Sequence, residues 1–345
     1  MAHRLLGALF TLLLAASPAQ AYDIVTGGKS GTYIQIGRNI GELVKQFNVD
    51  LKAVESAGSI ENVNAVYKRP VTPLGIVQSD VLGWIAVRSN DPELRNIAAK
   101  TRLVFPLYNE EVHVLARKGV ASLADLNGKR VAIGRAGSGS ELTATMMLAT
   151  AGITPAETIN IGAEEALARL KAGTLDAMVY VAGYPVKLLS DQVGSGDGLH
   201  LLPIDDPALL EFYPASEIPA GTYGWQASAV PVIAVKATLM TYDFPQTSQY
   251  LRNSCAAVAK VARAIRDNID WLRANGHPKW RQVDLDFQVP GWTQSTCVRD
   301  GLDSAKPDLL VPTSASPAGG EACKKACQAE ENPVRRSLCE IKCLE

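Results

Sequence analysis

The chain has few of the residues that catalytic and metal sites require. It contains four histidines in 345 residues, and those beyond the N-terminal segment, His113, His200 and His277, lie far apart. None has the spacing of a metal-binding pair, so we expect structural or exposed histidines, no metal and no cofactor. The chain also lacks a nucleophile elbow and a usable Cys–His pair. An enzyme is therefore not expected.

A strong net charge is also missing. The chain carries 34 basic and 35 acidic residues. Arg4 is the single charged residue of segment 1–21, so the remainder holds 33 basic and 35 acidic residues, a formal −2. This balance argues against nucleic acid or a membrane surface as a general partner.

Long apolar runs are confined to the N-terminus. Arg4 is followed by the apolar run from Leu5 to Ala16 and by the small-residue sequence Ala19-Gln20-Ala21. This is the pattern of a cleaved signal peptide over residues 1–21. No later run reaches the length of a membrane span. We expect a periplasmic protein with no direct membrane insertion, whose mature chain begins at Tyr22.

A glycine-rich loop near the start follows a short apolar strand, Ile24-Val25, and precedes residues with helical spacing. The glycines are Gly27, Gly28 and Gly31. A Walker A loop would need glycine at position 23, which is Asp, and the Rossmann order of glycines is also wrong. The loop instead predicts a helix N-terminus that offers free N–H groups to an anion. An ordinary strand-to-helix turn is the alternative.

A second loop of the same kind covers residues 134–141, between a strand at 129–133 and a helix at 142–150. Ser59, and then Gln78 and Ser79, follow two further strands. Ligands of open α/β sheets bind at this edge, beyond the carboxyl ends of the strands. The four exits therefore predict one binding site.

The six cysteines are an even number, which suits an oxidising compartment. Cys323-x3-Cys327 and Cys339-x3-Cys343 place each pair on one helix face, on either side of a turn. The arrangement resembles the disulfide-clamped twin CX3C hairpin, with pairs Cys323–Cys343 and Cys327–Cys339. A four-cysteine zinc site is the alternative. Cys255 and Cys297 remain to pair with each other.

Six stretches in order resemble the TAXI family, the solute receptors of TRAP transporters. They are Thr26-Gly27-Gly28-x-x-Gly31-x-Tyr33, Gly58-Ser59-x-Glu61-Asn62, Val77-Gln78-Ser79-Asp80, 122–131, Gly137-Ser138-Gly139 and 218–223. The resemblance covers about residues 22–292. Arg135-Ala136 stands where the family often has Ala-Pro, and Gly224-Trp225 stands where it often has Pro-Gly. The cysteine hairpin is not part of the family pattern.

The resemblance implies an α/β, two-lobe periplasmic-binding-protein type II fold with the ligand cleft between the lobes. Lobe I would hold 22–112 and 225–290, and lobe II would hold 113–220. The chain would cross between lobes near 110–113 and near 218–223. A linker over 291–320 and the cysteine helical hairpin over 321–345 would follow.

The function implied is capture of a small organic acid or amino acid, dicarboxylate- or glutamate-like, and its delivery to a TRAP-type membrane permease. The solute would be anionic or zwitterionic. A periplasmic sensor or scaffold that docks a membrane partner through the hairpin is the alternative. The expected ligand-binding residues are Thr26, Gly27, Gly28, Gly31, Tyr33, Ser59, Gln78, Ser79, Arg135, Gly137, Ser138, Gly139 and Tyr184. Arg135 is the sharpest of these, because a guanidinium can bind a carboxylate through two hydrogen bonds.

Overall fold

The computed structural model describes residues 21–303, without the side chains of Val87 and Arg88. Residues 1–20 of the expected signal peptide, most of the expected linker, and the expected cysteine hairpin with both of its expected disulfides lie outside the described residues. Within them, no helix is both long and apolar enough to span a membrane.

The first lobe starts with three strands that alternate with helices, as the sequence predicts. These elements are β1 (Ala21–Val25), α1 (Thr32–Lys45), β2 (Asp50–Val54), α2 (Ser59–Lys68) and β3 (Leu74–Gln78). β1 lies between β2 and β3 and is parallel to both. The glycine loop leaves β1 at the carboxyl edge of this parallel group and leads into α1. The helices α3 (Val81–Arg88) and α4 (Pro92–Lys100) follow β3.

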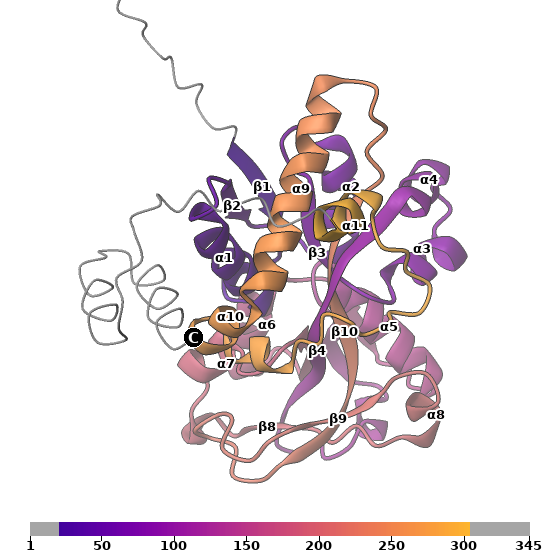
Figure 1. Cartoon of the computed structure of the whole chain (residues 1–345). Helices are drawn as coiled ribbons and strands as arrows, with labels where there is room; N and C mark the ends of the chain where they lie inside the picture. The colour runs from indigo at the N-terminus through magenta and orange to yellow at the C-terminus, as the bar shows by residue number, and fades with distance from the viewer. Residues whose placement is uncertain (1–20, 304–345) are drawn as a thin grey trace, which may run out of the picture. The chain divides into compact units, whose positions relative to one another are not determined.

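β4 (Thr101–Arg117) is a 17-residue strand that belongs to both lobes. Its first part pairs with β10 (Val230–Tyr242), and its last part pairs with β7. Figure 1 shows it running through the middle of the fold. The sequence favours two strands here, over 103–107 and 111–117, whereas the structure has one. The strand continues because both glutamates are buried and hydrogen-bonded.

The second lobe is built from shorter elements around its own core. They are η1 (Ala124–Leu126), β5 (Arg130–Ala132), α5 (Gly139–Thr150), β6 (Glu157–Ile159), α6 (Ala163–Lys171), β7 (Ala177–Ala182), α7 (Lys187–Gln192), η2 (Ser195–Asp197), β8 (Leu199–Leu201), α8 (Pro207–Leu210) and β9 (Ala215–Ile218). β5 lies between β6 and β7 and is parallel to both. The second glycine loop leaves β5 and leads into α5, which repeats the geometry of the first lobe.

One sheet connects the two lobes. Its strand order is β2-β1-β3-β10-β4-β7-β5-β6, with β8 on β4 and β9 on β10. Separate buried clusters lie on either side of the middle strands, one around Val131, Leu170 and Val179 and another around Ile24, Ile40 and Phe105. The two-lobe α/β architecture implied by the resemblance is confirmed.

The return crossing lies in β10, later than the expected residues 218–223. Ile218, Tyr223 and Ile233 are buried in the core of the second lobe. β10 pairs with β9 through its first residues and with β3 through Ala237 to Met240. The chain therefore stays with the second lobe until the middle of β10, because the strand is continuous for 13 residues.

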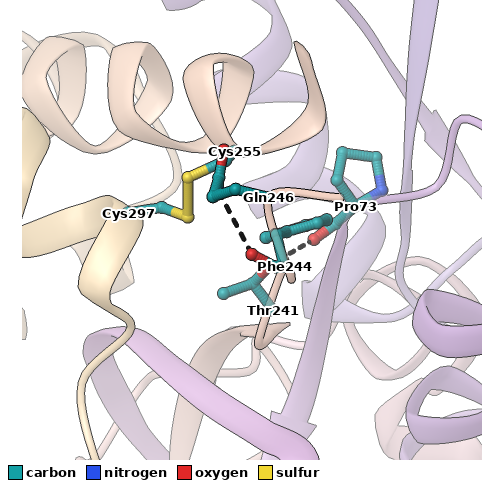
Figure 2. The surroundings of a disulfide bond; sticks show 6 residues. All are labelled: Pro73, Thr241, Phe244, Gln246, Cys255 and Cys297. Atoms are coloured by element: carbon teal, nitrogen blue, oxygen red, sulfur yellow. Dashed lines mark hydrogen bonds between the residues drawn. A yellow bond between two sulfur atoms is a disulfide. The ribbon is translucent and has the colours of Figure 1, made fainter. Parts of the chain in front are cut away.

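The chain closes on the outer side of the first lobe. The elements are α9 (Gln249–Asp267), α10 (Ile269–Asn275), η3 (Pro278–Gln282) and α11 (Thr296–Asp303). α9 and α11 lie against each other and are joined by the disulfide Cys255–Cys297, as the sequence predicts. Figure 2 shows this bond close to the end of β10, where the Thr241 hydroxyl donates to the Pro73 carbonyl. Residues 291–303, expected to begin a linker, thus include a helix fixed to the lobe.

Candidate functional site

A cleft between the lobes collects the ends of both glycine loops. Its cavity volume is about 90 Å³. A cavity of this size suits a small solute. The lining residues come from the loops after β1, β2, β3 and β5, from β4, and from β7 with its neighbour α6.

Four helices begin at the cleft, two from each lobe. Gly31 and Thr32 open α1, Gly58 and Ser59 open α2, Ser138 and Gly139 open α5, and Gly162 and Ala163 open α6. Helix N-termini carry unpaired N–H groups and partial positive charge. Four of them around one small cavity form an environment that favours an anionic group.

Buried polar side chains line the same space. The Ser59 hydroxyl accepts a hydrogen bond from the backbone N–H of Gln78 at 3.1 Å. The Ser138 hydroxyl accepts one from the backbone N–H of Glu141, also at 3.1 Å. Ser138 therefore caps α5, whereas α2 has Gly58 at its N-cap and no side-chain cap. Both hydroxyls keep a hydrogen to donate. Capping and contact with a solute are thus compatible for these serines.

The lobes touch each other around the cleft, so the structure is the closed form. The Ser30 hydroxyl donates to Glu164 Oε1 at 2.6 Å, the Thr143 hydroxyl donates to Gln78 Oε1 at 3.2 Å, and the Ile60 N–H donates to the Gly137 carbonyl at 3.1 Å. A Cβ atom at Gly139 would lie 2.3 Å from Gln78 Oε1, so a larger residue there would have to displace the Gln78 side chain. Hydrogen bonds of this kind hold a hinged pair of lobes in one of its two arrangements.

Arg135 and Glu164 stand together among the lining residues. Arg135 is exposed and lies close to Gly162, where an added Cβ would be 2.7 Å from its Nε. Burial raises the pKa of Glu164, but the Ser30 hydrogen bond and the charges of Arg135 and Lys29 outweigh this and hold it below its usual value. The Arg135 charge therefore acts on one carboxylate of the protein, that of Glu164, while its own side chain is exposed.

Glu110 lines the cleft from the middle of β4. It is 2% exposed, and its Oε2 accepts from the Tyr33 hydroxyl at 2.6 Å. Burial is the main cause that raises its pKa well above the usual range. The next residue, Glu111, points to the other face of β4 and pairs with Lys279 at 2.7 Å, both side chains being 1% exposed. Consecutive strand residues point to opposite faces, so one glutamate faces the ligand space and the other faces the core.

Comparison with known protein families identifies the chain. The profile of the NMT1-like family matches residues 24–281. The protein belongs to the NMT1-like family. The match takes in both lobes and every residue of the cleft.

Three solved structures to which this chain is similar are the following. The periplasmic binding protein BugD shares 11% identity over 71% of this chain and 85% of its own, with a TM-score of 0.47. MatC of Rhodopseudomonas palustris with bound malate shares 19% over 73% and 89%, with a TM-score of 0.46. An ancestral arginine-binding protein bound to arginine shares 13% over 76% and 95%, with a TM-score of 0.45.

Nine of the residues expected from the sequence line the cleft of this NMT1-like protein. They are Gly27, Gly28, Gly31, Tyr33, Ser59, Gln78, Arg135, Ser138 and Gly139. The four exits from parallel strands meet because all lie at the carboxyl edge of the same sheet. Their contact with a solute stays a prediction.

Four expected residues are not among those that line the cleft. The Thr26 hydroxyl donates to the Val54 carbonyl at 2.8 Å, and the Ser79 carbonyl accepts from Trp292 Nε1 at 2.8 Å. Gly137 turns the second loop with a φ of +77°. Tyr184 packs its ring beneath Lys279 Nζ at 3.9 Å and accepts from Gln282. The structure gives each of these residues a role in holding loops or the hinge.

Sequence reasoning missed several lining residues of this NMT1-like protein. The main ones are Glu110, Glu164 and Tyr180. Glu110 carried a signal, because two consecutive glutamates inside an apolar strand are unusual. Glu164 carried none, since it looks like an ordinary acidic residue of a helix first turn. Residues 21–303 contain no group of three or more His, Cys, Asp or Glu arranged to hold a metal ion.

Proposed function

We propose that the protein is an extracytoplasmic solute-binding receptor that captures a small organic acid or amino acid in the cleft between its lobes. The observation that carries this proposal is the meeting of four helix N-termini, two from each lobe, at one small cavity. A carboxylate bound there accepts hydrogen bonds from N–H groups of both lobes at once. Such a ligand favours the closed form, because only closure brings both sets of donors to it.

Closure of the lobes links solute binding to transport. A membrane permease can recognise a loaded receptor if the two lobes present a different outer surface when closed. A TRAP-type permease is the partner that the TAXI resemblance implies. A permease of that type encoded beside this protein, and solute uptake that depends on both, would support this partner. A neighbouring sensor kinase would instead favour a role in signalling.

The periplasmic location rests on the N-terminal sequence. Residues 1–21 have the three-part pattern of a secretory signal peptide, and Cys255–Cys297 is a disulfide in the structure. Disulfides persist in oxidising compartments. Export of the protein with Tyr22 as its first residue, shown by N-terminal sequencing, tests this location.

A thermal shift assay tests solute binding directly. Mature protein, refolded to remove any retained solute, is heated with dicarboxylates, oxoacids, hydroxy acids and amino acids. A ligand at a hundredfold over its Kd adds about 2.7 kcal/mol to the free energy of unfolding. This raises the Tm by a few degrees. If no acid shifts the Tm, the proposed function is wrong.

Arg135 provides the matched variant for that assay. Arg135→Ala is expected to weaken binding of the best acid by tenfold or more, because a charge-assisted hydrogen bond is worth about 1.5–3 kcal/mol. Arg38→Ala removes an exposed arginine of α1 that does not line the cleft. This control should leave the affinity unchanged. Equal affinity in both variants would remove Arg135 from the binding site.

A further inference from the structure

Two consecutive glutamates of β4 are buried to the same degree but are treated differently by the fold. Glu111 has a lysine partner, Lys279, and also accepts from the Ser216 hydroxyl and the Tyr184 N–H, both at 3.3 Å. Glu110 accepts one hydrogen bond, from Tyr33. Within residues 21–303, its second oxygen, Oε1, has no hydrogen-bond partner, and no cation forms an ion pair with it.

A buried carboxylate without a counter-charge is unfavourable, and proteins ordinarily pair it or protonate it. In the described part of the chain, Lys279 provides the counter-charge for Glu111, and no cation forms an ion pair with Glu110. The difference between them is that Glu110 lines the ligand cavity. A positively charged group of the bound solute can therefore supply the counter-charge that Glu110 lacks.

We infer that Glu110 selects solutes that carry a protonated nitrogen, by accepting a hydrogen bond from that nitrogen on its free carboxylate oxygen. This inference rests on the proposed function and narrows the solute to a zwitterion. The helix N-termini of α1, α2, α5 and α6 favour its carboxylate, and Glu110 binds its ammonium group. A solute with carboxylates alone offers Glu110 no positive partner and disfavours its ionised form.

Binding of such a solute moves a proton. Glu110 is hydrogen-bonded to Tyr33 of α1. The other titratable groups that influence it electrostatically are Asp80 at the start of α3, Tyr108 and Glu111 on β4, Tyr180 on β7, and Lys279 on η3. Lys279 is the single cation of this set and is taken by Glu111. Burial without a cation of its own raises the pKa of Glu110 well above its usual range, so Glu110 in the empty cleft holds a proton more tightly than an exposed glutamate does. The incoming ammonium keeps its own protons, the Glu110 proton leaves to solvent, and the carboxylate pairs with the ammonium.

Matched solutes that differ only in the nitrogen test this inference. Isothermal titration calorimetry would compare L-alanine, L-aspartate, L-glutamate and L-leucine, each with its 2-hydroxy acid. The wild-type protein is expected to bind at least one amino acid tenfold or more tightly than its hydroxy acid. Glu110→Gln should weaken that amino acid by tenfold or more and leave the hydroxy acid within threefold. Glu42→Gln, an exposed charge on α1, is the control and should change neither.

Proton release gives a readout that needs no variant. The binding enthalpy of the preferred amino acid at pH 7, measured in phosphate and in Tris, should differ by the amount expected for release of up to one proton. Affinity for the amino acid should also rise with pH. If the hydroxy acid binds equally well, if Glu110→Gln keeps the preference, or if protons are taken up, the inference is overturned while the receptor function stands. If no acid of either kind binds, the proposed function itself fails.

Discussion

At the scale of single residues, the fold buries some polar groups without full compensation. Asp80 follows β3 at the N-cap of α3, yet its side chain makes no capping hydrogen bond. Both carboxylate oxygens are buried and have no hydrogen-bond partner in the described part of the chain, although the residue as a whole is partly exposed. A cap is the usual role of aspartate at this position, and the structure does not use it.

Asp80→Asn is expected to stabilise the protein at neutral pH. Burial raises the pKa of Asp80 to about 6, so the folded state holds this proton more tightly than the unfolded state. The resulting penalty is absent below the unfolded value of about 3.8, grows as pH rises, and is complete above about 6. The difference between the folded and unfolded pKa values of Asp80 corresponds to a loss in free energy of unfolding of about 3 kcal/mol at most. Urea unfolding of both proteins at pH 3.5 and pH 7.5 measures it.

The pH dependence separates a charge effect from a packing effect. A gain in free energy of unfolding at pH 7.5 that vanishes at pH 3.5 supports the buried charge. The same gain at both pH values would mean that the asparagine packs or hydrogen-bonds better. Asp50→Asn, an exposed residue at the start of β2, is the control and should change the stability little at either pH.

At the scale of elements, the ion pair of Lys279 and Glu111 joins η3 to β4. Lys279→Met should lower the free energy of unfolding by about 3–5 kcal/mol, because it leaves a carboxylate buried without a partner. The double variant Glu111→Gln with Lys279→Met should recover much of this loss. Urea denaturation of the two single variants and the double variant measures their coupling. Lys187→Met breaks an exposed pair with Asp191 and should cost less than about 1 kcal/mol.

The disulfide Cys255–Cys297 fixes α11 to α9 and closes a loop with a sequence separation of 42 residues. In the chain-entropy account, such a loop is worth about 4 kcal/mol. The double variant Cys255→Ala with Cys297→Ala should therefore unfold at a lower urea concentration than wild type. Its solute affinity should stay the same, because neither cysteine lines the cleft. A large loss of affinity would show that α9 and α11 help to position the lobes.

Local sequence signals predict some elements of this fold and miss others. The strand–loop–helix units of both lobes are predictable, because apolar strands, glycine loops and helical periodicity are all local signals. The sequence favours two strands, 103–107 and 111–117, where the structure has β4, since a buried Glu110 between them is not expected until its partner Tyr33 is known. The return crossing in β10 was misplaced for a similar reason. Pairing with β9 and then β3 is a long-range property that local spacing does not encode.

In the candidate site too, local features could be predicted from the sequence and long-range contacts could not. Backbone features, such as the loop glycines and the start of each helix, could be predicted because they depend on strand-to-helix geometry. Thr26 and Tyr184 look equally suitable in sequence, but Thr26 bonds to β2 and Tyr184 packs on Lys279. Glu110 and Glu164 belong to the cleft only because the lobes close over each other. Side-chain direction and lobe contact could not be read from one stretch at a time.

At the scale of the whole molecule, function depends on the balance between open and closed lobes. The Ser30–Glu164 hydrogen bond is a direct link between them, because Ser30 belongs to the first glycine loop and Glu164 to the first turn of α6. Ser30 and Glu164 have no role in the core of either lobe. The bond therefore contributes to closure rather than to folding.

Glu164→Ala should shift the equilibrium toward the open form. A hydrogen bond to a charged group is worth about 1.5–3 kcal/mol, so the Kd for the preferred acid should rise by roughly 10- to 150-fold. Most of the change should fall on the dissociation rate, because closure follows capture. The neighbour Glu165 is exposed and faces Arg169 at 3.8 Å, so Glu165→Ala is the matched control and should bind as wild type. Stopped-flow kinetics and unfolding by urea separate closure from stability: an unchanged dissociation rate in Glu164→Ala would mean that this bond does not hold the lobes together.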